Sequence, residues 1–120
     1  MERARFITYD GKRILLVDFR GIETLEGLAS TAERVSRLIR DEPGDSVLVA
    51  VDVSGVPYSL RAVRLLGEIA AENKPYVRAR AVIGLSHLAR PIVRAVAQYT
   101  GRPVEAFDDL ESAMAWLATA

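Results

Sequence analysis

Hydrophobic and polar positions along the chain change their spacing several times, and these changes predict strands alternating with helices. Residues 5–9 and 14–19 are short apolar segments joined by Asp10-Gly11. This dipeptide tolerates the positive φ angles that a tight hairpin turn requires. We therefore expect the chain to open with an antiparallel hairpin.

The rest of the chain alternates between helical spacing and short apolar runs. The run 46–53 is almost entirely apolar, which is typical of a central strand covered on both faces. Apolar residues at intervals of three and four predict amphipathic helices before and after it. The expected helices are 25–40, 60–72, 87–100 and 109–117, and the further strands are 46–53, 79–85 and 104–106.

Residues typical of helix ends mark several of these boundaries. Ser59 and Ser86 stand where N-caps belong, because a serine hydroxyl accepts a hydrogen bond from a free amide of the first turn. Asp108 and Glu111 resemble a capping box, and Gly101 is placed to end a helix in a left-handed conformation.

The predicted order is β-β-α-β-α-β-α-β-α over 1–120, which we interpret as one domain of the α/β class. Strands separated by helices of ten or more residues require crossover connections and so a mostly parallel sheet. The opening hairpin makes the sheet mixed, with helices packed against it.

Composition narrows the classes of function. The sequence has 16 basic and 16 acidic residues, one histidine and no cysteine. A net charge of zero argues against a nucleic-acid partner and allows self-association. Without cysteine there is no disulfide and no thiolate metal site, and no metal or other cofactor is expected. The charged N-terminus and the short apolar runs predict neither a signal peptide nor membrane insertion, and we expect a cytoplasmic protein.

Four segments carry a resemblance to a known family. They are YDGKRILLVDFRG (9–21), VDVSGVPYS (51–59), NKPYVRARAVIGLS (73–86) and TGRPVEAFDDLESAMAWL (100–117). With the element order, they resemble the SpoIIAA-like (STAS-like) family of small bacterial domains. The resemblance covers nearly the whole chain and implies a small mixed sheet with helices packed against it. Most members have no assigned activity, and related domains include anti-sigma-factor antagonists, transporter regulatory domains and lipid-carrying proteins.

In the antagonists, a serine in a strand-to-helix turn is phosphorylated by a partner kinase. Ser59 lies near that position, although Tyr58 stands where the antagonists have an aspartate. A phosphate there would meet the positive end of a helix dipole, with Arg61 and Arg64 close in sequence. The alternative role of Ser59 is that of a plain N-cap.

Three other groups of residues suggest chemistry. Ser86 and His87 are adjacent, a pairing that a hydrolase would need in space as well as in sequence. Asp18 and Asp52 end two strands, where they serve either acid–base chemistry or the pinning of loops. A basic patch of Arg90, Arg94 and Arg102 with Arg80 or His87 would bind an anion, whereas arginines on a solvated helix face need no ligand.

Taken together, these features favour a non-enzymatic regulatory module that acts through self-association or a protein partner. The expected surface comprises Ser54, Gly55, Tyr58, Ser59, Arg61, Ser86, His87 and Arg90. The alternative is a carrier or sensor that holds a small apolar or anionic ligand between helices and sheet. A serine–histidine hydrolase is the least favoured of the three.

Overall fold

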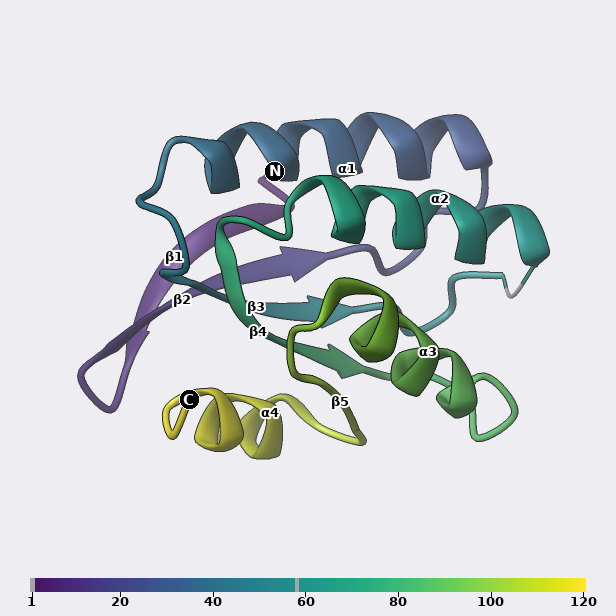
Figure 1. Cartoon of the computed structure of the whole chain (residues 1–120). Coiled ribbons are helices and arrows are strands. Elements are labelled where there is room, and N and C mark those ends of the chain that lie inside the picture. The colour runs from purple at the N-terminus through teal and green to yellow at the C-terminus, as the bar shows by residue number, and fades with distance from the viewer. Residues whose placement is uncertain (1, 58) are drawn as a thin grey trace.

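The computed structural model describes residues 2–57 and 59–120, and over these residues one five-stranded sheet is covered by helices on both faces (Figure 1). The strands lie in the order β1-β2-β3-β4-β5, so each strand pairs with its predecessor in sequence. The pair β1–β2 is antiparallel, and the pairs β2–β3, β3–β4 and β4–β5 are parallel. The predicted mixed α/β sheet with an N-terminal hairpin is confirmed.

The elements follow the predicted order with small shifts at their ends. The strands are β1 (Ala4–Tyr9), β2 (Lys12–Asp18), β3 (Val47–Asp52), β4 (Val77–Ile83) and β5 (Val104–Phe107), and the helices are α1 (Leu25–Arg40), α2 (Leu60–Glu72), α3 (Arg90–Thr100) and α4 (Leu110–Leu117). Asp10 and Gly11 both have positive φ angles, 49° and 77°, which confirms the hairpin turn.

The helices divide unequally between the two faces of the sheet, with α1, α2 and α3 on one and α4 on the other (Figure 1). Each parallel crossover steps the same way along the sheet. Right-handed crossovers that step one way place all their helices on one face. Helix α4 follows the last strand and is free to cover the opposite face.

The two apolar layers use alternate residues of the same strands. Leu15 and Val49 face α1 and α2, whereas Ile14 and Leu48 face α4. Residues Val47 to Ala50 of β3 are all buried, as the continuous apolar run predicted for a central strand. Helix α4 packs through Ala113 and Leu117, and beside them the rings of Phe107 and Trp116 lie 5.6 Å apart.

Several predicted boundaries were wrong by one to three residues. Strand β4 begins at Val77 rather than 79 and ends at Ile83 rather than 85, because its pairing with β3 starts at Val77, before a register shift at Arg78, and stops at Ile83. Helix α3 begins only at Arg90, after a turn. The N-cap of α4 is Asp109, whose carboxylate accepts from the Ser112 amide, rather than Asp108.

Candidate functional site

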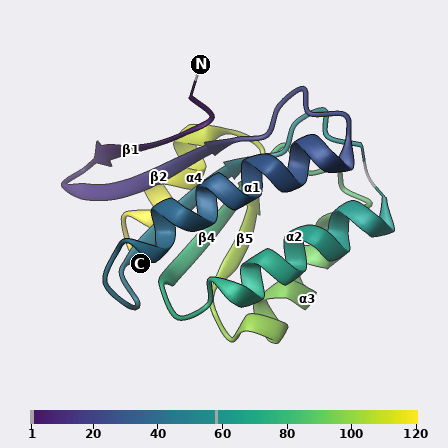
Figure 2. The ribbon, with the colours of Figure 1, turned by 90° about the horizontal axis from the view of Figure 1, so that it is seen from above.

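A cavity of about 330 Å³ lies between the sheet and the three helices that share its face. The backbone of helix α2 lies close mainly to α1 and α3 rather than to the sheet. Figure 2 shows α2 beside these two helices from above. Apolar side chains from four sources form most of the wall. They are Val49, Val51 and Val82 of the sheet, Ala32, Val35 and Ile39 of α1, Val63, Leu66 and Ile69 of α2, and Ile92, Val93 and Val96 of α3.

One end of the cavity reaches the carboxyl edge of the sheet, where the sequence placed its candidate site. Gly55, Ser59 and Ser86 line the cavity there. The structure therefore brings together the turns that follow the neighbouring parallel strands β3 and β4. Ligands of open α/β sheets bind at this edge.

The other predicted surface residues lie outside the cavity wall. Arg61 and His87 are exposed, and Ser54 and Arg90 are partly exposed. Ser54 instead packs against Gly84, and Arg90 lies at the start of α3. Tyr58 lies outside the described residues, so its predicted place in the surface stays a prediction.

Ser59 is the N-cap of α2. Its hydroxyl oxygen accepts a hydrogen bond from the Ala62 amide at 3.1 Å, and its backbone is extended as capping requires. The capping role is confirmed.

Ser86 does not cap α3, and that prediction was wrong. The N-cap is Ala89, which has no capping side chain, and the Ser86 carbonyl accepts from the Ala89 amide at 3.0 Å. Strand β4 ends early enough for a turn to fit between Ser86 and the helix. Both Ser86 and His87 are exposed, and in the described chain neither Ser86 nor Ser59 is hydrogen-bonded to the histidine side chain.

Two of the arginines predicted to form a basic patch are paired with acidic side chains. Arg90 pairs with Asp108, and Arg102 pairs with Asp45 at 2.6 Å. Arg94 is exposed on α3. Two of the three arginines are therefore engaged in ion pairs at the surface, and their binding of an anion stays a prediction.

Arg80 is different, because its side chain borders the cavity. It stands opposite Val49 of β3 and Val104 of β5, well inside the sheet. Protein atoms surround it on nearly all sides, and it keeps some accessible surface where it meets the cavity. Burial lowers the pKa of Arg80 to about 10, so the guanidinium stays charged at neutral pH.

The Arg80 side chain has no ion-pair or hydrogen-bond partner among residues 2–57 and 59–120. The described cavity wall contains no aspartate or glutamate, and its other polar side chains are Ser59, Asn73 and Ser86. From the sequence, Arg80 was predicted only as an addition to a patch of Arg90, Arg94 and Arg102. The available signal was its position inside VRARAVI, where Arg80 precedes Val82 on the same face of the strand.

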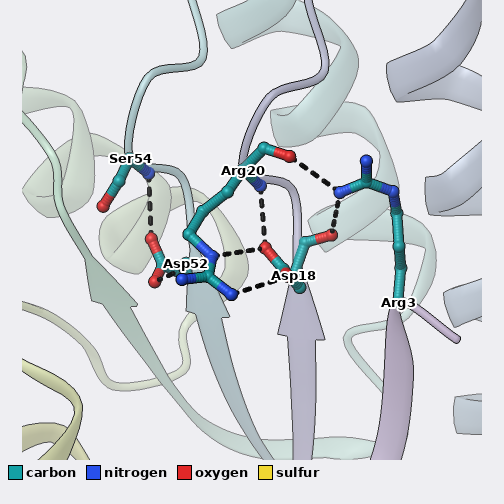
Figure 3. A network of polar contacts seen from close by, with 5 residues as sticks. All are labelled: Arg3, Asp18, Arg20, Asp52 and Ser54. Atoms are coloured by element: carbon teal, nitrogen blue, oxygen red, sulfur yellow. Dashed lines mark hydrogen bonds and ion pairs between the residues drawn. The ribbon is translucent and has the colours of Figure 1, made fainter. Parts of the chain in front are cut away.

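Asp18 and Asp52 end β2 and β3 opposite each other and are joined through Arg20 (Figure 3). The Arg20 guanidinium donates to both Asp18 carboxylate oxygens, at 3.0 and 3.1 Å, and its Nε lies 3.8 Å from Asp52. Each carboxylate also accepts from a backbone amide two residues on, Arg20 and Ser54 respectively. The loop-pinning role is confirmed.

These contacts hold the pKa of Asp18 below its ordinary value, chiefly through the hydrogen bond from the Arg20 side chain. Arg3 closes the outer side of the network by donating to the carbonyls of Asp18 and Arg20, at 3.2 and 2.8 Å. The carboxyl edge around Phe19 and Val53, two residues of the cavity wall, is therefore fixed by a compact polar network.

Comparison with known proteins identifies the architecture. A crystal structure of an uncharacterized protein from the DUF3478 family, with a SpoIIAA-like fold, from Shewanella loihica PV-4, superposes with a TM-score of 0.76. The match covers 95% of this chain and 91% of that one, at 16% sequence identity. The chain has a SpoIIAA-like fold. At this identity the likeness establishes the fold alone, and it confirms the resemblance predicted from the sequence at that level.

Other comparisons add nothing to this SpoIIAA-like domain. No protein-family model matches the sequence, and no curated protein matches it. Among the described residues, no group of three or more histidine, cysteine or acidic side chains could hold a metal ion, and no helix has the length and apolar character to cross a bilayer. Function must therefore be argued from the cavity itself.

Proposed function

We propose that this SpoIIAA-like domain is a non-enzymatic binding module for a small, largely apolar ligand held between the sheet and helices α1 to α3. The observation that carries the proposal is the cavity of about 330 Å³ with its mostly apolar wall. Ligand sites are typically concave, apolar and of about 300–1,000 Å³, with a few polar groups for orientation. Of the wall serines, Ser59 is engaged as a helix cap.

The wall of the cavity supports binding rather than imperfect packing. Protein interiors are normally close-packed, with few voids larger than a water molecule. Gly67 lies inside helix α2 and lines the cavity, and a Cβ atom built there would meet nothing within 4 Å. Alanine at an interior helix position is more stable than glycine by about 1 kcal/mol and would fit here, so close packing does not explain the glycine.

A ligand without charge tests the cavity alone. We would titrate the ¹⁵N-labelled protein with decanol and follow amide shifts by NMR. The shifts should concentrate at residues such as Leu66, Val93 and Val96, and leave α4 on the opposite face unchanged. Native mass spectrometry of gently purified protein would in parallel reveal a retained small mass.

The matched variants are Gly67→Ala and Gly67→Leu. Alanine should raise stability by up to about 1 kcal/mol and retain binding, whereas leucine should occupy the space and weaken decanol binding at least about tenfold. Saturable shifts that persist in a folded Gly67→Leu protein would place the ligand elsewhere. A wild-type protein that binds no decanol and carries no co-purified mass would refute the proposal.

A second candidate is self-association through the same sheet edge, which the sequence favoured. Leu60 and Leu88 are 79% and 92% exposed, and they follow Ser59 and His87 in the two strand-to-helix turns. The occupant we propose is a second copy of the chain, because a net charge of zero gives little repulsion between copies.

Sedimentation velocity tests this candidate directly. If the edge is a dimer interface, Leu88→Ser and Arg61→Ala should shift the equilibrium toward monomer. Arg34→Ala, which removes an exposed charge on α1, should leave it unchanged. A wild-type protein that remains monomeric at high concentration would exclude the dimer.

A further inference from the structure

We propose that the ligand is an amphipathic monoanion, a carboxylate with an apolar body of about ten non-hydrogen atoms, whose head group pairs with Arg80 inside the cavity. This inference rests on the proposed binding function and specifies its ligand class. It depends on three features of the described chain: a cavity, one cationic side chain on its wall, and no acidic side chain there.

The position of Arg80 sets the depth of the head group. Arg80 precedes Ile83, the last residue of β4, by three residues, and each strand residue advances about 3.3 Å. The guanidinium therefore originates about 10 Å inside the carboxyl edge of the sheet. Val49 and Val104 flank it on the neighbouring strands, so a charged group of the ligand would meet Arg80 and otherwise apolar surface.

Among the described residues, Arg80 has no partner for its charge, although the surrounding protein shields much of the side chain from water. Charges removed from water are usually paired, because desolvation costs several kcal/mol per ion. By contrast, the partly exposed Arg90 and Arg102 are paired with aspartates, and the exposed Arg40 is paired with Glu72. A ligand anion would provide the missing partner, and the planar guanidinium matches a carboxylate in two-point geometry.

The chemistry of the wall selects the charge and size of the ligand. One guanidinium neutralises one negative charge, so a dianionic head would leave a second charge facing valines. A volume of about 330 Å³ equals the liquid volume of about ten water molecules, which sets the approximate size of the apolar body. Decanoate meets both conditions.

The test compares decanoate with decanol, which has the same chain length and no charge, by calorimetric titration at pH 7. Wild-type protein should bind decanoate at least about tenfold more tightly than decanol. Arg80→Met should remove this preference while retaining decanol binding. The matched control is Arg78→Met, which removes an exposed charge from the same strand and should leave both affinities unchanged.

Thermal unfolding without ligand gives a second measurement. Arg80→Met should raise the midpoint, because it replaces an unpaired charge that the protein largely shields from water with a shorter, apolar side chain. A lower midpoint would assign Arg80 a structural role and count against the proposal. Equal binding of decanol and decanoate would overturn the anion assignment while leaving the binding function intact, and failure of both to bind would refute the binding function itself.

The kind of anion is tested by decyl phosphate. Weaker binding than decanoate is expected, since its second charge has no partner in the cavity wall. Binding as tight as that of decanoate would overturn the assignment of a singly charged head group.

Discussion

The Asn73 side-chain amide donates a hydrogen bond to the Ser36 hydroxyl at 3.0 Å, and both residues are almost completely buried. This contact joins the end of α2 to the last turns of α1. The Asn73 carbonyl also accepts from the Tyr76 and Val77 amides, at 3.0 and 3.2 Å, as the chain turns into β4. One residue thus sets the spacing of two helices beside the cavity that Asn73 lines.

Ser36→Ala should lower the free energy of unfolding by about 1–3 kcal/mol, because it leaves a buried amide donor without an acceptor. Urea unfolding would measure the change. Ser30→Ala provides the control, since Ser30 is exposed on the same helix. In a double-mutant cycle with Asn73→Ala, purely additive effects would contradict a direct interaction.

Gly84→Ala should destabilise the protein by two separate effects. Gly84 has a φ angle of 82°, and a Cβ atom there would lie 2.9 Å from the Ser54 Cβ and would overlap the Ser54 hydroxyl. Gly101 has a similar φ angle of 68°, but a Cβ atom there would meet no other atom within 4 Å. A larger unfolding penalty at Gly84 than at Gly101 is therefore expected, and Ser54→Gly should recover part of the difference. Equal penalties would show that the close approach contributes nothing.

Ser59→Ala should cost about 1 kcal/mol of stability through loss of the α2 N-cap, whereas Ser59→Asp should retain most of it because aspartate also caps. Chemical unfolding of the two variants would provide the comparison. If Ser59→Asp were as unstable as Ser59→Ala, the hydrogen bond to the Ala62 amide would not be the source of the effect.

The network around Asp18 should make stability depend on pH in the acid range. Its folded-state pKa lies below the ordinary value of 3.8, so its stabilising contribution is fully present above that value. The contribution is lost as the pH falls through the lowered folded-state pKa. The difference in unfolding free energy between wild type and Asp18→Asn should therefore shrink from pH 7 to pH 2.5.

Added salt should reduce the same difference at pH 7, because Arg20 is exposed and its charge is screened. Asp10→Asn, at the exposed hairpin turn, serves as the comparison variant. A difference that stayed constant over the whole pH range would argue against the ion pair as its origin.

Most of the fold could be predicted from the sequence, because turns, strands and helix ends are marked by residues that lie close together along the chain. Asp10-Gly11 specified the hairpin, the run 46–53 specified the central strand, and Ser59 and Gly101 marked helix ends that the structure confirms. The start of β4 was misplaced because Arg78 interrupts the apolar pattern, whereas the strand begins one residue earlier, at Val77, on the far side of a register shift at Arg78.

The cavity could not be predicted in the same way. Val63, Leu66 and Val96 recur at helical spacing whether they pack tightly or border an open space, so periodicity cannot distinguish the two. The isolation of Arg80 depends equally on where every acidic side chain falls in three dimensions. Only the carboxyl-edge members of the wall, Gly55, Ser59 and Ser86, were accessible to topology-based reasoning.

The sequential strand order also has a consequence for synthesis on the ribosome. Every strand pairs with the one made just before it, so each new segment finds its hydrogen-bonding partner already in place. Burial of the side chains is not as immediate as strand pairing. The sheet face that carries Ile14, Leu48 and Ala81 stays uncovered until α4 is complete. A nascent chain paused before residue 110 would present this apolar surface to its surroundings, and it is there that we expect chaperones to engage the growing protein.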